Sequence, residues 1–113
     1  MTDQDWVEEF PAAVTVCDAD GNILMMNQKE RRQFNLAEGE TLAGRNLADC
    51  HSKSSNRKIK RLMRRQQMTV YTVEEYSKRE LIIQGPWYQN GKFSGLVEIS
   101  IDLAGEILHV VRK

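Results

Sequence analysis

The spacing of hydrophobic residues changes along the chain and separates strands from helices. Residues 13–27 hold two runs of β-branched and aliphatic side chains around Asp20-Gly21-Asn22. Asp-Gly is a strong hairpin signal, because glycine accepts the positive φ that tight turns require. Residues 28–34 are typical of a short helix. From residue 54 to residue 67 apolar side chains recur at i, i+3, i+4 and i+7, which predicts a second helix, N-capped by Ser54 or Ser55.

The last third of the chain predicts three antiparallel strands. Residues 69–75, 78–88 and 93–103 are β-branched, aromatic or alternating, and Asn90-Gly91 marks another hairpin turn. In the final strand one face is apolar (Phe93, Val97, Ile99, Ile101) and the other polar (Ser94, Glu98, Ser100, Asp102). Since this alternation is typical of a sheet covered on one side, we expect the apolar set to face the helices. The predicted order is two strands, helices, then three strands.

The length of the chain indicates one domain with a short segment at each end. Its 113 residues are enough for one core and too few for two. Pro11 disfavours helix at the preceding residue, so we expect residues 1–12 to form a helical cap that ends near Phe10. The domain itself is predicted over residues 13–103. Residues 104–113 are predicted to form a connector helix or an extended tail.

Composition points to a cytoplasmic protein with reduced thiols. No run approaches the roughly 20 apolar residues of a membrane-spanning helix, and residues 1–10 are acidic, unlike a signal peptide. The two cysteines, Cys17 and Cys50, form no CxxC pair and no disulfide framework. We therefore predict no membrane segment.

The positive charge of the chain is concentrated in one predicted helix. The formal net charge is +0, yet residues 51–68 hold seven basic and no acidic side chains. The helix over residues 56–67 carries six of them: Arg57, Lys58, Lys60, Arg61, Arg64 and Arg65. Such a cluster is able to neutralise phosphates, which makes nucleic-acid binding an alternative function. The neutral total charge argues against it, because acidic residues among the first 50 are available to pair with this helix within the fold or across a dimer.

Several short motifs, taken in order, resemble the PAS (Per-ARNT-Sim) family over residues 10–103. They are the opening strand with Asp18-x-Asp20-Gly21, Ile23 to Met26 leading into Asn27, Gly44-Arg45-Asn46-Leu47, Tyr76 and Lys78 before Leu81 to Gly85-Pro86, Gly95-Leu96-Val97-Glu98, and Ile101-Asp102. The resemblance implies an α+β fold, in which a five-stranded antiparallel sheet carries short helices on one face. It also implies a sensory, signal-transducing module of bacterial type.

The resemblance further implies a cavity between the sheet and the helices, for a small ligand. Candidate lining residues are Met26, Leu47, His51, Ile59, Met63, Tyr71, Ile83, Val97 and Ile99. The ligand is unknown. Flavin is not supported, because Leu47 occupies the position of the reactive cysteine in photosensory relatives. Haem is not supported either. Haem-binding relatives generally ligate the iron through a histidine on the long helix, and the corresponding residues 54–67 contain no histidine.

Cys50-His51 is the remaining candidate for a metal or haem ligand, since thiolate and imidazole both bind soft metals. A structural zinc needs four ligands, and only Cys17 and His109 are left to complete the set, at no recognised spacing. The alternative is a buried cysteine beside a hydrogen-bonded histidine. We therefore predict no metal site.

The other face of the sheet is predicted to be covered by the N-terminal cap or by a second chain. The residues assigned to this cap or dimer face are Trp6, Phe10, Leu24, Ile82 and Leu96. A homodimer is the expected partner, together with an output domain or a signalling partner in trans. The chain lacks a nucleophile-elbow pattern and a phosphate-binding glycine loop, so no catalytic residue is predicted. Three functions stay open: a ligand sensor, a protein-interaction module without ligand, and a nucleic-acid binder.

Overall fold

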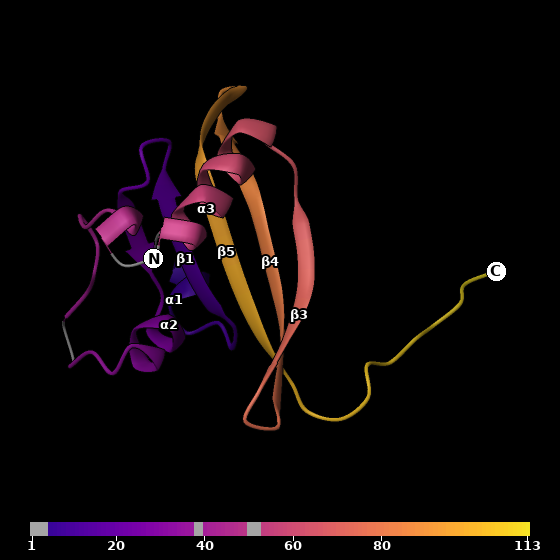
Figure 1. Cartoon of the computed structure of the whole chain (residues 1–113). Coiled ribbons are helices and arrows are strands. Elements are labelled where there is room, and N and C mark those ends of the chain that lie inside the picture. Colours follow the sequence, from indigo (N-terminus) through magenta and orange to yellow (C-terminus); the bar gives the residue numbers. More distant parts are fainter. Residues whose placement is uncertain (1–4, 38–39, 50–52) are drawn as a thin grey trace.

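The computed structural model describes residues 5–37, 40–49 and 53–113 and shows one antiparallel sheet with helices on both sides (Figure 1). The elements, in chain order, are α1 (Asp5–Glu8), β1 (Ala13–Asp18), β2 (Ile23–Met26), α2 (Gln28–Gln33), the 3-10 turn η1 (Leu47–Asp49), α3 (Lys53–Arg65), β3 (Thr69–Glu75), β4 (Lys78–Gln89) and β5 (Lys92–Leu103). The sheet order is β2-β1-β5-β4-β3, with every neighbouring pair antiparallel. The predicted α+β, five-stranded fold is confirmed.

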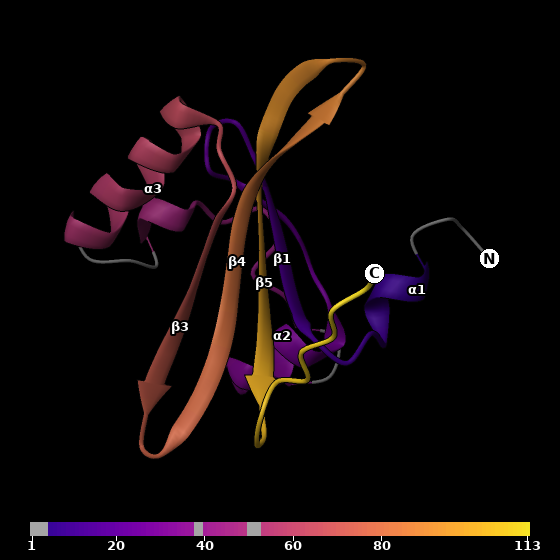
Figure 2. The ribbon, with the colours of Figure 1, turned by 90° about the vertical axis from the view of Figure 1, so that its right-hand side faces the viewer.

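The first and the last strand of the chain, β1 and β5, lie side by side in the middle of the sheet. β5 pairs with β1 from Ala13↔Ser100 to Asp18↔Gly95, so the first hairpin and the last three strands form one surface. Figure 2 shows α3 on one side of this surface and α1 on the other. The helix α2 lies on the side of α3, because Glu30 of α2 lines the same cavity as Ile59 and Leu62 of α3. We call the side of the sheet that carries α2 and α3 the inner face.

The hairpin turns lie where the sequence predicted them at the positions marked by glycine or asparagine. Asn90 and Gly91 adopt φ values of 54° and 77°, the paired positive φ of a type I′ hairpin turn between β4 and β5. The β3–β4 turn has the same sign pattern at Tyr76 and Ser77, with φ values of 51° and 64°. No glycine marks that turn in the sequence, so its position was predicted only from the ends of the strands.

The helix α3 differs in two respects from the expected one. It begins at Lys53, so Ser54 and Ser55 lie in its first turn, and the predicted N-cap was wrong. None of its described side chains is buried. The buried apolar residues gather instead at β1, at the ends of β2, and at the segment that leads in from α1. The helix α3 therefore packs loosely against the sheet, and the edge strand β3 beside it has no buried side chain either.

Residues 104–113 form neither helix nor strand and extend away from the sheet (Figure 1). Their apolar side chains are exposed, among them Leu108 at 92%. The described helices are too short or too polar to cross a membrane.

The predicted choice of faces on β5 was wrong. Glu98 bonds Gln84 of β4 on the inner face, and Ser100 lies two residues further along on the same side. Side chains alternate along a strand, so Val97, Ile99 and Ile101 point to the outer face. The alternation itself was read correctly, but the polar set is the one that faces the helices.

Candidate functional site

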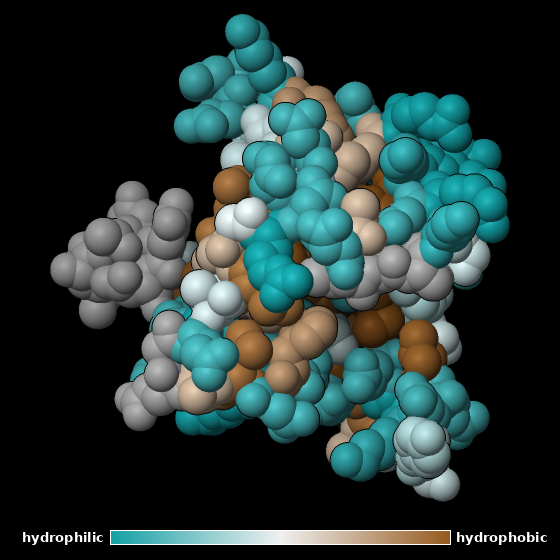
Figure 3. All heavy atoms as spheres, turned by 60° about the vertical axis from the view of Figure 1, so that its left-hand side comes forward, coloured by the Kyte–Doolittle hydropathy of each residue, from teal (hydrophilic) through white to brown (hydrophobic). Residues whose placement is uncertain are grey.

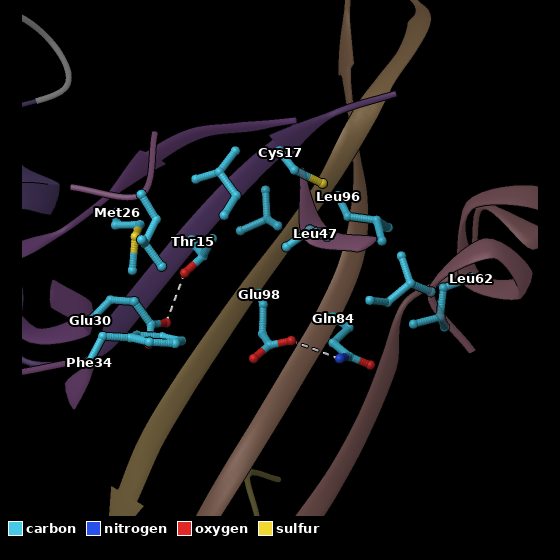
Figure 4. A pocket seen from close by; sticks show the side chains of 14 residues that line it. Thr15, Cys17, Met26, Glu30, Phe34, Leu47, Leu62, Gln84, Leu96 and Glu98 are labelled. Atoms are coloured by element: carbon cyan, nitrogen blue, oxygen red, sulfur yellow. Dashed lines mark hydrogen bonds between the residues drawn. The ribbon is translucent and has the colours of Figure 1, made fainter. Parts of the chain in front are cut away.

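A cavity of about 110 Å³ lies between α3 and the inner face of the sheet. Its apolar lining comes from β1, β2, β5, α3 and the segments between β2 and α3: Cys17, Ile23, Met26, Phe34, Leu42, Leu47, Ile59, Leu62, Leu96 and Val97. Thr15, Glu30, Gln84 and Glu98 supply its polar groups. The space-filling view in Figure 3 shows hydrophobic side chains recessed between hydrophilic ones, and Figure 4 shows the lining from close by.

The turn between β1 and β2 fixes the segment that brings Leu47 to the cavity. The Asp18 carboxylate accepts bonds from the main-chain amides of Asp20 and Asn22, at 2.9 and 2.8 Å. The Asn46 side chain then donates to the Asp20 carbonyl at 2.9 Å, and the Leu47 amide donates to the Gly21 carbonyl at 2.8 Å. These bonds give the motif residues around Gly21 and Asn46 a structural role.

Asn27 holds Glu30 in place at the other end of the cavity. Its side chain is fully buried and N-caps α2 by accepting a bond from the Glu30 amide, at 3.2 Å. The same oxygen accepts from the Val14 amide at 2.9 Å, while the amide nitrogen donates to the carbonyls of Val7 and Ala12. Because α1, β1 and α2 all meet at this side chain, the position of Glu30 is well determined.

The cavity contains two carboxylates, each bonded to one neutral partner. The Thr15 hydroxyl donates to Oε2 of Glu30 at 2.8 Å, and the Gln84 amide donates to Oε2 of Glu98 at 2.8 Å (Figure 4). Glu30 is only 7% exposed. Burial raises the pKa of its carboxyl group, the Thr15 hydrogen bond opposes that rise, and the charges of Glu98 and Glu80 add to it.

A wider groove of about 630 Å³ adjoins the cavity along α3 and β3. Ile59, Leu62, Gln84 and Glu98 line both spaces. The groove also contains Tyr71, together with the basic side chains Lys58, Arg61 and Arg65. The cavity is therefore apolar and acidic, whereas the adjoining groove carries the positive charge of α3.

Some of the candidate residues from the sequence lie at these spaces. Met26, Leu47 and Ile59 line the cavity, and Tyr71 lines the groove. Val97 borders the cavity as well, although the alternation of β5 directs its side chain outward. Whether any of them binds a ligand stays a prediction.

Other candidates lie elsewhere. Met63 lines a separate shallow groove with Arg57 and Arg64, because it sits one residue round the helix from Leu62. Ile83 and Ile99 pair with each other on the outer face and are absent from the cavity lining. The pair Cys50-His51 falls outside the described residues. In the part of the chain that the structure describes, no group of three or more His, Cys, Asp or Glu side chains is placed to hold a metal ion.

The residues predicted for the cap or dimer face are divided between the two sides of the sheet. Ile82 and Leu96 are buried on the inner face, at 7% exposure each, so their assignment to the outer face was wrong for the same reason as on β5. Leu24 is 49% exposed, at the β-bulge where β2 loses register with β1. Trp6 and Phe10 contact each other edge to face, with ring centroids 5.6 Å apart, and both remain exposed.

Sequence reasoning missed the polar groups of the cavity. The sequence placed Glu98 on the polar face of the last strand, away from the helices, and assigned no role to Glu30. The pairing of the strands carries a usable signal. Gln84 and Glu98 are directly opposite each other on β4 and β5, and their amide and carboxylate are able to bond. Two side chains that face solvent need no such complementary partner.

The comparisons with known proteins agree with this architecture. A model of the PAS fold matches residues 7–105, which is most of the chain. The chain therefore belongs to the PAS family, and the resemblance predicted from the sequence is confirmed. No curated protein matches the chain.

Solved structures with the same fold include three PAS or sensor proteins. The PAS domain of Bordetella pertussis BvgS aligns with a TM-score of 0.67 at 12% identity, covering 88% of this chain and 82% of that chain. The PAS domain of the histidine kinase ThkA gives 0.68 at 18% identity, covering 80% and 98%. A sensory box sensor histidine kinase from Vibrio cholerae gives 0.67 at 15% identity, covering 89% of each. At these identities the likeness shows the fold.

Proposed function

We propose that this chain is a sensory module that binds a small ligand in the cavity under α3 and relays its presence through the sheet. The observation that carries the proposal is the cavity itself, which combines apolar walls with a few convergent polar groups. Sensory and signalling roles are the general ones of PAS domains, and catalysis is not. The proteins of similar fold include histidine kinases.

The loose packing of α3 supports a relay that depends on ligand. Ile59 and Leu62 are half-buried and meet the sheet across the cavity. A ligand that fills this space gives the side chains of Ile59 and Leu62 partner atoms that they otherwise lack. The ligand therefore has a higher affinity for the conformation in which α3 is docked on the sheet than for one in which α3 is displaced. The differential affinity shifts the equilibrium toward the docked state.

A filled-cavity variant tests the proposal. We expect Leu62→Trp to occupy the space and to abolish ligand binding, because the indole ring is larger than the isobutyl group it replaces. Met63→Trp is the matched control, since it lies on the neighbouring side of α3, in a different groove. Native mass spectrometry of the chain purified from cells measures the outcome. A mass excess on the parent chain and on the control variant, absent from Leu62→Trp, supports the proposal, whereas no excess on the parent chain after incubation with a metabolite extract contradicts it.

A protein-interaction module is the second candidate, supported by the outer face of the sheet. We use the term outer stripe for its apolar side chains: Val16, Val70, Leu81, Ile83, Val97, Ile99 and Ile101. Val70 is 51% exposed, and the others are half-buried. Contiguous apolar surface of this kind is typical of a contact between chains, and a homodimer is the simplest occupant. A dimer with no bound ligand favours this candidate over the sensor.

One observation on the basic side chains of α3 supports nucleic-acid binding as a third candidate function. The six basic side chains of the predicted helix 56–67 make no ion pair within the described part of the chain, so pairing inside the fold does not account for them. Affinity for DNA that falls steeply with added salt supports phosphate contacts, and absence of binding at low salt excludes them.

A further inference from the structure

The charge of the cavity lining restricts the chemistry of its ligand. The lining holds two carboxylates, Glu30 and Glu98, and no lysine, arginine or histidine from the described residues. An organic acid bound there would add a third negative charge without a cation to balance it. The positive side chains of the adjoining groove, Lys58, Arg61 and Arg65, form no ion pair with Glu98.

Each of the two carboxylates also keeps one oxygen without a donor. Thr15 and Gln84 bond only the Oε2 atoms, and among the described residues no donor reaches Oε1 of either carboxylate. Glu30 is 7% exposed and lines the cavity, and no fully buried side-chain oxygen of the described residues lacks a partner, so the Oε1 atom of Glu30 keeps some accessible surface there. Figure 4 shows both side chains on the same side of the sheet, one from α2 and one from β5. An accessible carboxylate oxygen without a protein donor is free to accept a hydrogen bond from a ligand, and ammonium groups are among the strongest donors.

We propose that the cavity binds a small aliphatic amine in its protonated form, with the ammonium group bonded to Glu30 and Glu98 and the hydrocarbon part against Leu47, Ile59 and Leu62. An ammonium ion has three donors and no acceptor, which matches acceptor-only carboxylates. The proposal rests on the proposed function and deepens it, because it names the class of ligand that the sensor detects.

The size of the cavity limits the hydrocarbon part. A protein cavity of roughly 150 Å³ accommodates benzene, which has six carbon atoms. At about 110 Å³ this cavity is smaller. The ligand it encloses therefore has about four to six non-hydrogen atoms by the same comparison. Longer amines would extend into the adjoining groove past Gln84 and meet the basic side chains there.

Three probes of similar shape and different charge test the assignment: butylammonium chloride, 1-butanol and sodium butyrate. Each is titrated into the full chain at pH 7.5 and followed by amide chemical shifts in two-dimensional NMR. We expect butylammonium to bind about tenfold more tightly than butanol, since its ammonium group bonds charged acceptors, and butyrate to bind more weakly than either. Equal or tighter binding of butanol or butyrate overturns the amine assignment and leaves a ligand-binding cavity.

Variants of the carboxylates separate a specific contact from a general effect of charge. Glu98→Gln is expected to lower butylammonium affinity about tenfold and butanol affinity much less, because a neutral hydroxyl also bonds the amide oxygen of glutamine. Glu98→Asp keeps the charge and is expected to retain the preference for the cation. Glu74→Gln removes the same charge from an exposed site on β3 and is expected to change neither affinity. A thermal melt of each variant confirms folding.

The outcomes distinguish the amine assignment from the proposed function. If Glu98→Gln reduces the affinities for butylammonium and butanol equally, or if none of the three probes binds, the amine assignment is overturned. In both cases the mass measurement on the Leu62→Trp and Met63→Trp pair decides independently whether the cavity binds another ligand.

Discussion

The main-chain amide of Val14 on β1 donates a 2.9 Å hydrogen bond to the side chain of Asn27, which lies between β2 and α2. The same side chain bonds the Glu30 amide and the carbonyls of Val7 and Ala12, so all of its hydrogen-bonding capacity is used inside the protein. A single amide thus connects the cap, the first strand and the helix that carries one cavity carboxylate.

Replacing Asn27 is therefore expected to be strongly destabilising. Asn27→Asp removes both donors and brings a carboxylate oxygen against two carbonyl oxygens, while Asn27→Ala leaves the four main-chain groups without their partner. We expect a loss of about 3 kcal/mol in the free energy of unfolding for either change, because buried polar groups are left unpaired. Urea denaturation measures it. Gln33→Ala, at the exposed end of α2, is the control, with an expected change within about 0.5 kcal/mol. Equal effects of the Asn27 and Gln33 variants would contradict this role.

Gly95 is the position where β5 passes closest to β1. Its φ is +146°, and a Cβ atom there would overlap the Cys17 carbonyl oxygen and the main chain of Asp18. We expect Gly95→Ala to separate the two strands and to cost more than about 3 kcal/mol, since main-chain atoms must move. Gly91→Ala is the matched control: its φ is also positive, at +77°, but no atom lies within 4 Å of the added methyl group. Only conformational strain of about 1 kcal/mol is expected there. Chemical denaturation of both variants tests the difference, and a Gly91 effect as large as the Gly95 effect would show that strain alone is responsible.

The fold followed from the sequence because local signals agreed with one another. The Asp20-Gly21 and Asn90-Gly91 turns, the β-branched runs and the exit residue Asn27 each specify one piece of the sheet, and their order allows few topologies. Local signals do not specify which face of β5 the helices cover. An alternating strand fits either face, and the choice depends on strand register and on which side α2 and α3 cross.

The cavity was harder to predict than the sheet for the same reason. The inner face of β5 is the polar one, carrying Glu98 and Ser100, so hydrophobicity pointed to the wrong set of residues. A small domain whose core lies mainly at β1 and β2 is able to tolerate polar groups where β4 and β5 pass under α3. Such a departure from the usual apolar interior is expected where a protein binds something.

The pKa of Glu30 leads to a pH dependence of stability with a definite sign. Because burial raises the pKa of this carboxyl group, the folded chain holds its proton more tightly than the unfolded chain, whose value is near 4.3. The stability that the protonated Glu30 carboxyl group contributes is fully present below the pKa of the unfolded chain. It is lost as the pH rises through the pKa of this group in the folded chain. Glu30→Gln resembles the protonated form at every pH, so we expect it to be more stable than the parent chain at pH 8, with a difference that shrinks on acidification.

Urea denaturation of both proteins between about pH 4 and pH 8 measures this difference. Comparing the two proteins cancels the opposite contribution of Glu8 and Asp18, whose lowered pKa values make stability fall as the pH drops. A difference that grows toward low pH would mean that Glu30 is held as a carboxylate in the folded chain.

The outer stripe is expected to form a homodimer contact centred on Ile83 and Ile99. These two residues are directly paired across β4 and β5, and Val70 of β3 continues the row beyond Ile83. Ile83→Lys places a charge in the middle of that surface, where burial without a partner costs on the order of 2 kcal/mol or more. We therefore expect the dimer to weaken by at least about tenfold in sedimentation velocity experiments. The control Tyr76→Lys adds the same charge at the β3–β4 turn, where the side chain is 90% exposed, and should leave association unchanged. A parent chain that stays monomeric at high micromolar concentration would remove the dimer hypothesis, and the outer stripe would then need a partner other than a second copy of this chain.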